Sequence, residues 1–270
     1  MGEHSGPIVW GSDLHLDHAT LAARQEMIAG VTSSRAGAVV ITGDLSTASG
    51  LVRNLELIAD ATSSPVFFVL GNHDHYGAGV ARVRDLVVEL AQHNPRIQWL
   101  PPRGVVELEP HVVLVGVDGW ADGRHGEPLS TPLVLNDDRL IAELAAQPSR
   151  AGKLTVMRTL ADADAARLAI LLERAIALDA RRIVVATHVP PFPEALPSIG
   201  HLAGPDWLPI LVCGATGAVL RRVAADHPDR TFLVLCGHTH VEMDVMIAPN
   251  LRCMVAGARY GAPGVLVVGR

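Results

Sequence analysis

The sequence contains few cysteines, and they are too far apart to suggest a disulfide framework. Only three occur in 270 residues, namely Cys213, Cys236 and Cys253, and no two of them form a Cys-X-X-Cys pair. An odd number of widely spaced cysteines argues against a small secreted domain stabilised by disulfides. The simplest interpretation is a chain with reduced thiols in the cytoplasm.

The sequence also lacks the segments that would direct it to a membrane or to nucleic acid. No apolar run approaches the ~20 residues needed to span a bilayer, and residues 1–7 lack the basic and apolar regions of a signal peptide. The net charge is −6, and no basic run suited to nucleic-acid backbones occurs. We therefore expect no membrane association and no general nucleic-acid binding. A small anionic substrate stays compatible with this charge, because a local metal site can override it.

The composition is that of a folded globular protein. Hydrophobic residues make up 49% of the chain and charged residues 19%, which excludes a disordered chain. No repeat, low-complexity tract or linker divides the sequence, so we predict one domain over residues 1–270. Histidine is the unusual feature, since several of the thirteen histidines lie where predicted strands end.

The first hundred residues alternate between buried strands and amphipathic helices. We predict strands over residues 7–11, 38–42 and 65–70, and helices over residues 19–29, 50–60 and 80–90. This rhythm is typical of parallel strands joined by crossover helices.

The pattern changes after Gln98 to one that indicates an antiparallel or mixed sheet. We predict short strands over residues 99–100, 105–108 and 112–117, and then a long loop over residues 118–132. Asn136 could cap a helix over residues 137–146. Further helices are predicted over residues 153–179, with an interruption near 160–163, and over 215–225. The remaining strands are expected over residues 182–186 and 231–236 and within 242–268, the last of these in the second sheet.

Five of the predicted strands end in side chains that can bind a metal ion. These side chains are Asp13 and His15, Asp44, Asn72 and His73, His188, and His238 and His240. Because strand ends gather at one edge of an α/β sheet, five distant segments could converge on one pocket. One ion would not need so many ligands, since catalytic ions often use three protein ligands and water.

Two ions roughly 3.5–4 Å apart and bridged by one carboxylate would use this set well. Their surplus charge would attract a phosphate, and a water between them would be deprotonated to give a nucleophile. An imidazole that is not a ligand could protonate the departing oxygen. Without cysteine in the set, ions such as Mn, Fe, Zn or Ni are favoured over a structural thiolate site.

The ordered motifs resemble a known family. Asp13-Leu14-His15, Gly43-Asp44, the tetrapeptide Gly-Asn-His-Asp at 71–74, His188 and Gly-His-Thr-His at 237–240 look like the five signature blocks of calcineurin-like metallophosphoesterases. Each block alone is weak, but the ordered set is specific and extends over most of the chain. The resemblance implies an α/β fold, a four-layer α/β/β/α sandwich with two mixed β-sheets, around a two-metal site.

The resemblance also implies a role for each matching residue. The first metal ion would be bound by Asp13, His15 and His240. The second would be bound by Asn72, His188 and His238, with Asp44 bridging the two ions. His73 would act as general acid or transition-state donor, and Asp74 would orient it.

The motifs differ from those of one branch of the family. Protein serine/threonine phosphatases usually continue the second block with Val-Asp-Arg-Gly and have Glu after the Asn-His pair. Here Leu45, Ser46 and Thr47 follow Asp44, and Asp74 follows His73. We therefore expect a phosphodiesterase or small-molecule phosphatase that acts on a small phosphoester. A phosphomonoesterase on a metabolite or nucleotide is the alternative, and a non-catalytic metal-binding regulatory module is a more remote one.

Residues that could contact the substrate are predicted around this site, namely His18, His75, Asp122, Arg124 and Tyr260. Arg124 suits a phosphate, although a loop arginine is more often simply solvated. The segments 118–132 and 191–209 could form a lid over the pocket. The sequence leaves the oligomeric state open.

Overall fold

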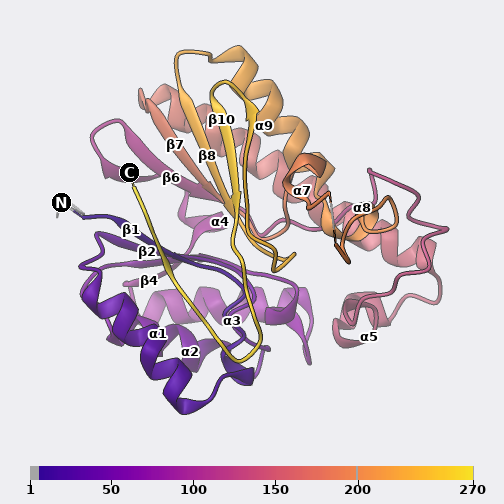
Figure 1. Ribbon diagram of the computed structural model, residues 1–270, viewed down its shortest axis with the longest axis horizontal. Coiled ribbons are helices and arrows are strands. Elements are labelled where there is room, and N and C mark those ends of the chain that lie inside the picture. The colour runs from indigo at the N-terminus through magenta and orange to yellow at the C-terminus, as the bar shows by residue number, and fades with distance from the viewer. Residues whose placement is uncertain (1–5, 199, 270) are drawn as a thin grey trace.

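The computed structural model describes residues 6–198 and 200–269, and within them the chain forms two mixed β-sheets (Figure 1). The first sheet, in the order β11-β1-β2-β3-β4, contains β1 (Ile8–Gly11), β2 (Ala38–Thr42), β3 (Val66–Val69), β4 (Ile97–Trp99) and β11 (Leu266–Val268). The second, in the order β5-β6-β7-β8-β10-β9, contains β5 (Val106–Glu109), β6 (Val112–Gly116), β7 (Arg182–Ala186), β8 (Thr231–Cys236), β9 (Met243–Ala248) and β10 (Leu251–Val255).

Helices cover the outer face of each sheet. The first sheet packs against α1 (Leu21–Ser33), α2 (Leu51–Asp60) and α3 (Val80–His93). The second packs against α7 (Arg150–Ala177) and α9 (Gly214–Asp226). The shorter helices are α4 (Leu100–Arg103), α5 (Asp137–Leu140), α6 (Ala142–Ala145) and α8 (Leu208–Leu211), with 3₁₀ turns η1 (Leu16–His18), η2 (His73–His75) and η3 (Pro193–Ala195). No helix in the described ranges is long and apolar enough to cross a membrane.

A third apolar cluster lies between the two sheets. Trp10 and Phe67 of the first sheet join Leu114, Val184 and Leu235 of the second in this cluster, and all five side chains are buried. Each sheet is thus covered on both faces, which explains why the strands are apolar along nearly their whole length. The predicted four-layer α/β/β/α sandwich is confirmed.

The central strands of each sheet are parallel and in register. β1 pairs with β2, β2 with β3 and β3 with β4, whereas in the second sheet β6, β7 and β8 run parallel. The carboxyl ends of these strands therefore share one edge of their sheet. This arrangement brings together the loops in which the sequence places the candidate ligands.

The predicted strand at residues 99–100 is wrong in its extent and in its sheet. Trp99 ends β4, which pairs in parallel with β3 of the first sheet, and Leu100 begins α4. Pro101 and Pro102 occupy the first turn of this helix, where proline loses no backbone hydrogen bond. The change of sheet therefore falls after α4.

The predicted helix over residues 137–146 is broken at Ile141. This residue is extended and forms an isolated parallel bridge with Ala78, and the amide of Ala142 donates to the carbonyl of Ala78 at 2.9 Å. Asn136 precedes α5 without the expected side-chain cap, and its Oδ1 instead accepts from Arg139 at 2.6 Å. The bridge thus replaces one predicted helix by two short ones.

The helix predicted over residues 153–179 is longer at its start and is not interrupted. It begins at Arg150 after Ser149, whose hydroxyl accepts from the amide of Gly152, and it ends at Ala177. Ala161, within the expected interruption, is fully buried, and the Asp164 carboxylate accepts from the amide of Gly119 at 2.9 Å. Packing on this face holds the helix continuous.

The last strand lies in the first sheet, although the whole 242–268 segment was expected in the second. β11 pairs antiparallel with β1, with Ile8 opposite Val268. Val268 is buried in the apolar cluster between the sheets. Val268 thus completes this cluster next to β1, which explains why the last strand joins the first sheet.

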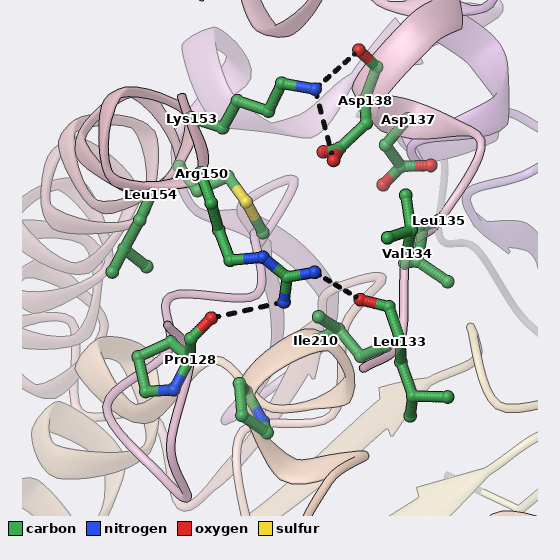
Figure 2. A pocket seen from close by; sticks show the side chains of 12 residues that line it. Pro128, Leu133, Val134, Leu135, Asp137, Asp138, Arg150, Lys153, Leu154 and Ile210 are labelled. Carbon is green, nitrogen blue, oxygen red and sulfur yellow. Dashed lines mark hydrogen bonds and ion pairs between the residues drawn. The ribbon is translucent and has the colours of Figure 1, made fainter. Parts of the chain in front are cut away.

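Two basic side chains of α7 hold the segment that follows the long loop (Figure 2). Arg150 donates to the carbonyl oxygens of Thr131 at 2.7 Å and Leu133 at 3.1 Å. Lys153 donates to the carbonyl of Asp138 at 3.0 Å and lies 3.2 Å from its carboxylate. The start of α5 is therefore tied to α7.

Candidate metal centre

The candidate ligands lie in loops that follow the carboxyl ends of five parallel strands. Three loops come from the first sheet and two from the second, and they carry Asp13, Asp44, Asn72, His188 and His238. The two sheets are joined here directly, because Nδ1 of His188 lies 2.8 Å from the carbonyl oxygen of Thr42 in β2. The predicted convergence of distant segments is therefore present in the structure.

Five of the seven candidate ligands have a left-handed backbone conformation. They are Asp13 (φ 51°), His15 (φ 40°), Asp44 (φ 52°), His238 (φ 70°) and His240 (φ 59°). For residues other than glycine this conformation costs about 1–3 kcal/mol each and is concentrated at functional sites. Asp13 and His15, which are two residues apart, both contribute to one donor cluster in this conformation.

Two glycines make room for the carboxylates of the site. A Cβ atom at Gly71 would collide with Oδ1 of Asp44, and one at Gly237 would collide with Oδ2 of Asp13. Any side chain at either position would therefore displace a candidate ligand. This close approach explains why both motifs contain glycine at that point.

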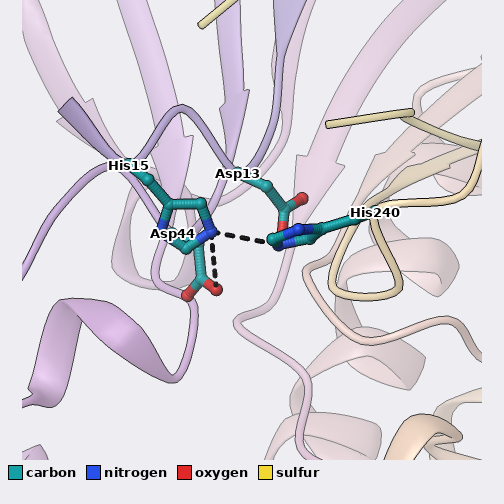
Figure 3. Close-up of side chains that lie close together, drawn as sticks. All are labelled: Asp13, His15, Asp44 and His240. Atoms are coloured by element: carbon teal, nitrogen blue, oxygen red, sulfur yellow. Dashed lines mark hydrogen bonds and ion pairs between the residues drawn. The ribbon is translucent and has the colours of Figure 1, made fainter. Parts of the chain in front are cut away.

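The first donor cluster consists of Asp13, His15, Asp44 and His240, which point toward one another in Figure 3. One ligand atom from each lies within 4.8 Å of the others. Nε2 of His240 is 3.0 Å from Nε2 of His15 and 3.3 Å from Oδ1 of Asp13. Two carboxylates and two imidazoles at these distances can hold one divalent cation.

The second donor cluster is defined by the direction of its hydrogen bonds. A carbonyl oxygen can only accept, so Nδ1 of His188 donates to Thr42 and Nε2 of His238 donates to Ile210 at 3.1 Å. In the neutral rings, the other nitrogens, Nε2 of His188 and Nδ1 of His238, then carry lone pairs. An imidazole fixed through one nitrogen in this way commonly binds a metal through the other.

Asn72 completes the second cluster with its amide oxygen. Its Oδ1 lies 3.0 Å from Nε2 of His188 and 3.1 Å from Nδ1 of His238. An oxygen and two imidazole lone pairs converge at this point, which is favourable only if a proton or a cation lies between them. The donor types and their directions fit a divalent metal ion.

Asp44 lies between the two clusters. Its Oδ1 is 3.4 Å from Nε2 of His188, whereas its Oδ2 is 3.9 Å from Nε2 of His15. Each oxygen of this buried carboxylate therefore faces a different set of imidazoles. The arrangement is the one that a bridging ligand requires.

Burial and neighbouring negative charge shift the pKa values of the imidazoles in opposite directions. Burial lowers the pKa of His15 to about 4 and also lowers the pKa of His238. Burial would lower the pKa of His188 too, but the adjacent Asp44 carboxylate outweighs it and raises that pKa to about 10. A metal ion that binds Nε2 of His188 would therefore displace a proton.

His73 lies beside the first cluster and lines the cavity above it. Its backbone amide donates to Oδ1 of Asp44 at 2.8 Å, and its Nε2 is 3.9 Å from Oδ2 of the same carboxylate. Its ring stacks on Tyr76 with a centroid distance of 4.2 Å. The side chain is 19% exposed, so it can reach a ligand in the cavity.

The orienting role expected for Asp74 is not the one that its contacts indicate. Its buried carboxylate accepts from the backbone amides of Asp44, Leu45, Ser46 and Gly71 at 2.8–3.1 Å. These bonds fix the loop after β2 against the loop after β3. Asp74 therefore positions the Asp44 loop, in place of orienting the imidazole of His73.

Two of the predicted substrate residues lie at the rim of the site. Tyr260 is half exposed, and its ring is 4.4 Å from that of His15 and 5.2 Å from that of His240. His18 is exposed, and its ring contacts Tyr260 at 5.0 Å. Both side chains can contact a ligand that enters from this side.

The structure does not place the other three predicted substrate residues in the lining of the cavity. His75 is fully buried and packs on Trp120 at 5.3 Å, because the η2 turn points it inward. The Asp122 carboxylate, also fully buried, accepts from Arg124 and from the amide of Ala215. Arg124 is further paired with Asp162 at 2.6 Å, so its charge is already satisfied away from the metal centre.

A cavity of about 300 Å³ opens over the donor clusters. His201, Leu202 and Trp207 line it, so the segment 191–209 contributes to its wall, although Ile199 lies outside the described residues. The loop 118–132 does not contribute to this lining among the described residues. The residues that replace it are Leu135, Asn136 and Asp137, just beyond the predicted boundary.

The sequence did not identify Tyr76 or Asp137 as residues of this site. Oδ1 of Asp137 accepts from Oη of Tyr76 at 2.6 Å and from Nδ2 of Asn72 at 2.8 Å. Tyr76 could have been noted from its place four residues after Asn72. No sequence pattern indicates Asp137, because only the folded chain brings it to Asn72.

The chain is similar to one protein family and to several solved structures. The model of the calcineurin-like phosphoesterase family matches residues 6–242. The fold is similar to that of a phosphopantetheinyl hydrolase from Mycobacterium tuberculosis, with 15% identity, a TM-score of 0.67, and coverage of 98% of this chain and 97% of that one. It is also similar to a dimetal phosphatase from Danio rerio, with 14% identity, a TM-score of 0.57, and coverage of 94% and 88%. No curated protein matches the sequence.

Proposed function

Because this chain belongs to the calcineurin-like phosphoesterase family, we propose that it hydrolyses a small phosphate ester with the help of two divalent metal ions. The family assignment makes it a metal-dependent phosphoester hydrolase. The number of ions and the kind of ester are our proposals. The observation that supports them best is the pair of donor clusters that share the Asp44 carboxylate.

The residues present fit two ions of similar chemistry. The first ion would be held by Asp13, His15, Asp44 and His240, and the second by Asn72, His188, His238 and Asp44. Mixed imidazole and oxygen ligands suit Mn, Fe, Zn or Ni. When bound, the ions would supply positive charge for the phosphoryl oxygens and activate water as the nucleophile.

His73 is the residue that we propose to protonate the departing oxygen. Its imidazole lines the cavity, and its ring contacts the rings of Tyr76 and His15, with centroid distances of 4.2 and 4.6 Å. The backbone bond to Asp44 fixes the residue relative to the bridging carboxylate. Such a group can deliver a proton without being a metal ligand.

Replacing His73 by alanine is expected to lower kcat about 10²-fold while both metal ions stay bound. The rate falls because the leaving oxygen departs without a proton, whereas none of the proposed ligands is changed. Turnover and metal content per chain should be measured on the same preparation. A loss of one metal ion would contradict this role and make His73 a ligand.

The wall of the cavity supports a substrate with one phosphate and an uncharged organic group. Besides the donor clusters, the cavity is lined by apolar and aromatic side chains, namely Leu135, Leu202, Trp207, Leu211 and Tyr260. None of the described residues that line this cavity is lysine or arginine. A second phosphate would find no lysine or arginine there, whereas a flat or apolar group could bury its surface.

The size of the cavity supports small-molecule substrates over phosphorylated proteins. A volume of about 300 Å³ is at the lower end of the range for small ligands. We favour a phosphodiesterase or a small-molecule phosphatase, with a phosphomonoesterase on a small metabolite or nucleotide as the alternative. One protein of similar fold is named for hydrolysis of a phosphopantetheinyl group, so an ester of this kind belongs among the substrates to be tested.

We also propose that residues 1–270 act as one domain in the cytoplasm, without a membrane or nucleic-acid partner. The apolar cluster shared by both sheets supports the single domain. The odd number and wide spacing of the three cysteines in the sequence support a reducing compartment.

The proposal can be tested with mono- and bis-p-nitrophenyl phosphate after the metal is stripped and Mn, Zn, Fe, Ni or Mg is added back. We expect activity to be restored by at least one ion and to need two ions per chain. Faster hydrolysis of the bis ester would assign a phosphodiesterase, and faster hydrolysis of the mono ester would assign the alternative. Two tightly bound ions without turnover on a broad phosphoester panel would instead indicate a non-catalytic metal-binding module.

A further inference from the structure

Asp137 belongs to none of the signature motifs, yet it contacts a candidate metal ligand. It lies at the start of α5 and is 6% exposed. Its Oδ1 accepts from Nδ2 of Asn72 at 2.8 Å and from Oη of Tyr76 at 2.6 Å. This carboxylate is therefore placed between the wall of the cavity and the second donor cluster.

The chemistry of these groups determines which way the Asn72 amide faces. An ionised carboxylate can only accept hydrogen bonds, so the NH₂ group must turn toward Asp137 and the oxygen toward His188 and His238. Without Asp137, the NH₂ group could instead donate to the lone pairs of the two imidazoles. That rotation would present two protons to the position where a cation would bind.

We propose that Asp137 is a positioning residue that holds the Asn72 amide oxygen toward the second metal ion. This inference rests on the two-metal function proposed above. Tyr76 donates to the same carboxylate oxygen, and its Oη is a second and more distant acceptor for Nδ2 of Asn72, at 3.4 Å. The Tyr76 ring stacks on His73, so one acid also supports the ring behind the proposed proton donor. Groups of this kind typically change metal affinity about 10–100-fold.

Asp137 is itself held by the rest of the segment. Lys153 of α7 binds both the carbonyl and the carboxylate of the next residue, Asp138 (Figure 2). On the other side of α5, the bridge between Ile141 and Ala78 connects the segment to the residues after η2. The carboxylate is therefore placed by rigid contacts at both ends of a four-residue helix.

The test is the affinity of the full-length, metal-stripped protein for Mn²⁺, measured by calorimetric titration. Asp137→Ala is expected to weaken the binding step that fills the second donor cluster, here called the second step, about 10–100-fold. It should change the step that fills the first donor cluster less than about threefold. Asp138→Ala is the matched control, since it removes an acid from the same helix but keeps the bond from Lys153 to the backbone carbonyl of residue 138 that holds the segment. Equal affinities in Asp137→Ala and in the wild-type protein would overturn the proposal.

A double-mutant cycle separates positioning from direct coordination. If Asp137 acts through Asn72, Asp137→Ala should weaken Mn²⁺ binding no further once Asn72→Ala is present. Additive losses would mean that Asp137 binds the metal itself, which contradicts the proposal. Tyr76→Phe should leave both affinities unchanged, because Nδ2 of Asn72 keeps its 2.8 Å bond to Asp137 and loses only the 3.4 Å contact with Oη of Tyr76.

Thermal unfolding of the metal-stripped variants shows whether the loss of metal affinity in Asp137→Ala is a local effect or reflects a loss of folded structure. A Tm close to that of the wild-type protein is expected. If Asp137→Ala does not fold, Asp137→Asn keeps the volume and removes the charge, and it should weaken the second step at least about threefold. Because metal binding is measured without substrate, a failure of the phosphoesterase proposal would leave this result interpretable.

Discussion

Asp44→Asn is expected to lower kcat at least about 10³-fold while the protein keeps its fold. The two oxygens of this carboxylate face His188 on one side and His15 on the other, at 3.4 and 3.9 Å. An amide has the same shape but only one oxygen and no charge, so it cannot neutralise and join two cations. Turnover and the number of bound metal ions both report on this change.

Asp60→Asn is a suitable control for Asp44→Asn, because it makes the same replacement at a 77% exposed position. It should match the wild-type protein in turnover and metal content. Circular dichroism should show the same secondary structure in both variants. Full activity in Asp44→Asn would contradict the bridging role.

Asp118→Ala is expected to destabilise the protein by about 3–5 kcal/mol. This fully buried carboxylate accepts from Arg84, from the indole of Trp99 and from the amide of Leu70, each at 2.9 Å. Removing it leaves two buried N–H groups without their acceptor, and it leaves the partly buried Arg84 guanidinium with only the more distant carboxylate of Asp164, at 3.7 Å. Urea unfolding monitored by fluorescence gives the free energy of unfolding directly.

The exposed ion pair of Arg252 and Asp244 serves as a comparison for the buried Asp118 network. Both side chains are nearly half exposed, with 46% and 49% of their surface accessible, and they meet in two short contacts across β9 and β10. Asp244→Ala should therefore change the free energy of unfolding by less than about 1 kcal/mol. If Asp118→Ala also lowered the free energy of unfolding by less than about 1 kcal/mol, the buried network around Asp118 would contribute little to stability.

The metal centre could be predicted because its signal is local. Each candidate ligand follows a buried apolar strand within a few residues, and parallel strands bring such ends together without any knowledge of side-chain packing. The structure places Asp13, His15, Asp44 and His240 within 4.8 Å of one another, as this argument requires. The first half of the fold was predictable for the same reason.

The errors concern contacts between residues that are distant in sequence. Arg124 is paired with Asp162, and His75 is enclosed by Trp120, so neither is available to a substrate. Asp137 reaches Asn72 only because α7 and the bridge at Ile141 hold its segment there. The pairing of β11 with β1 likewise depends on an apolar interface that forms only after folding.

The candidate ligands come from both sheets, which connects metal binding to the stability of the whole fold. Asp13, Asp44 and Asn72 follow strands of the first sheet, whereas His188 and His238 follow strands of the second. An unfolded chain cannot present these five loops together, so a cation binds the native state and shifts the equilibrium toward it by mass action. At a concentration 100 times its Kd, one ion adds about 2.7 kcal/mol to the free energy of unfolding. The availability of metal in the cell would then set the lifetime of this protein as well as its activity.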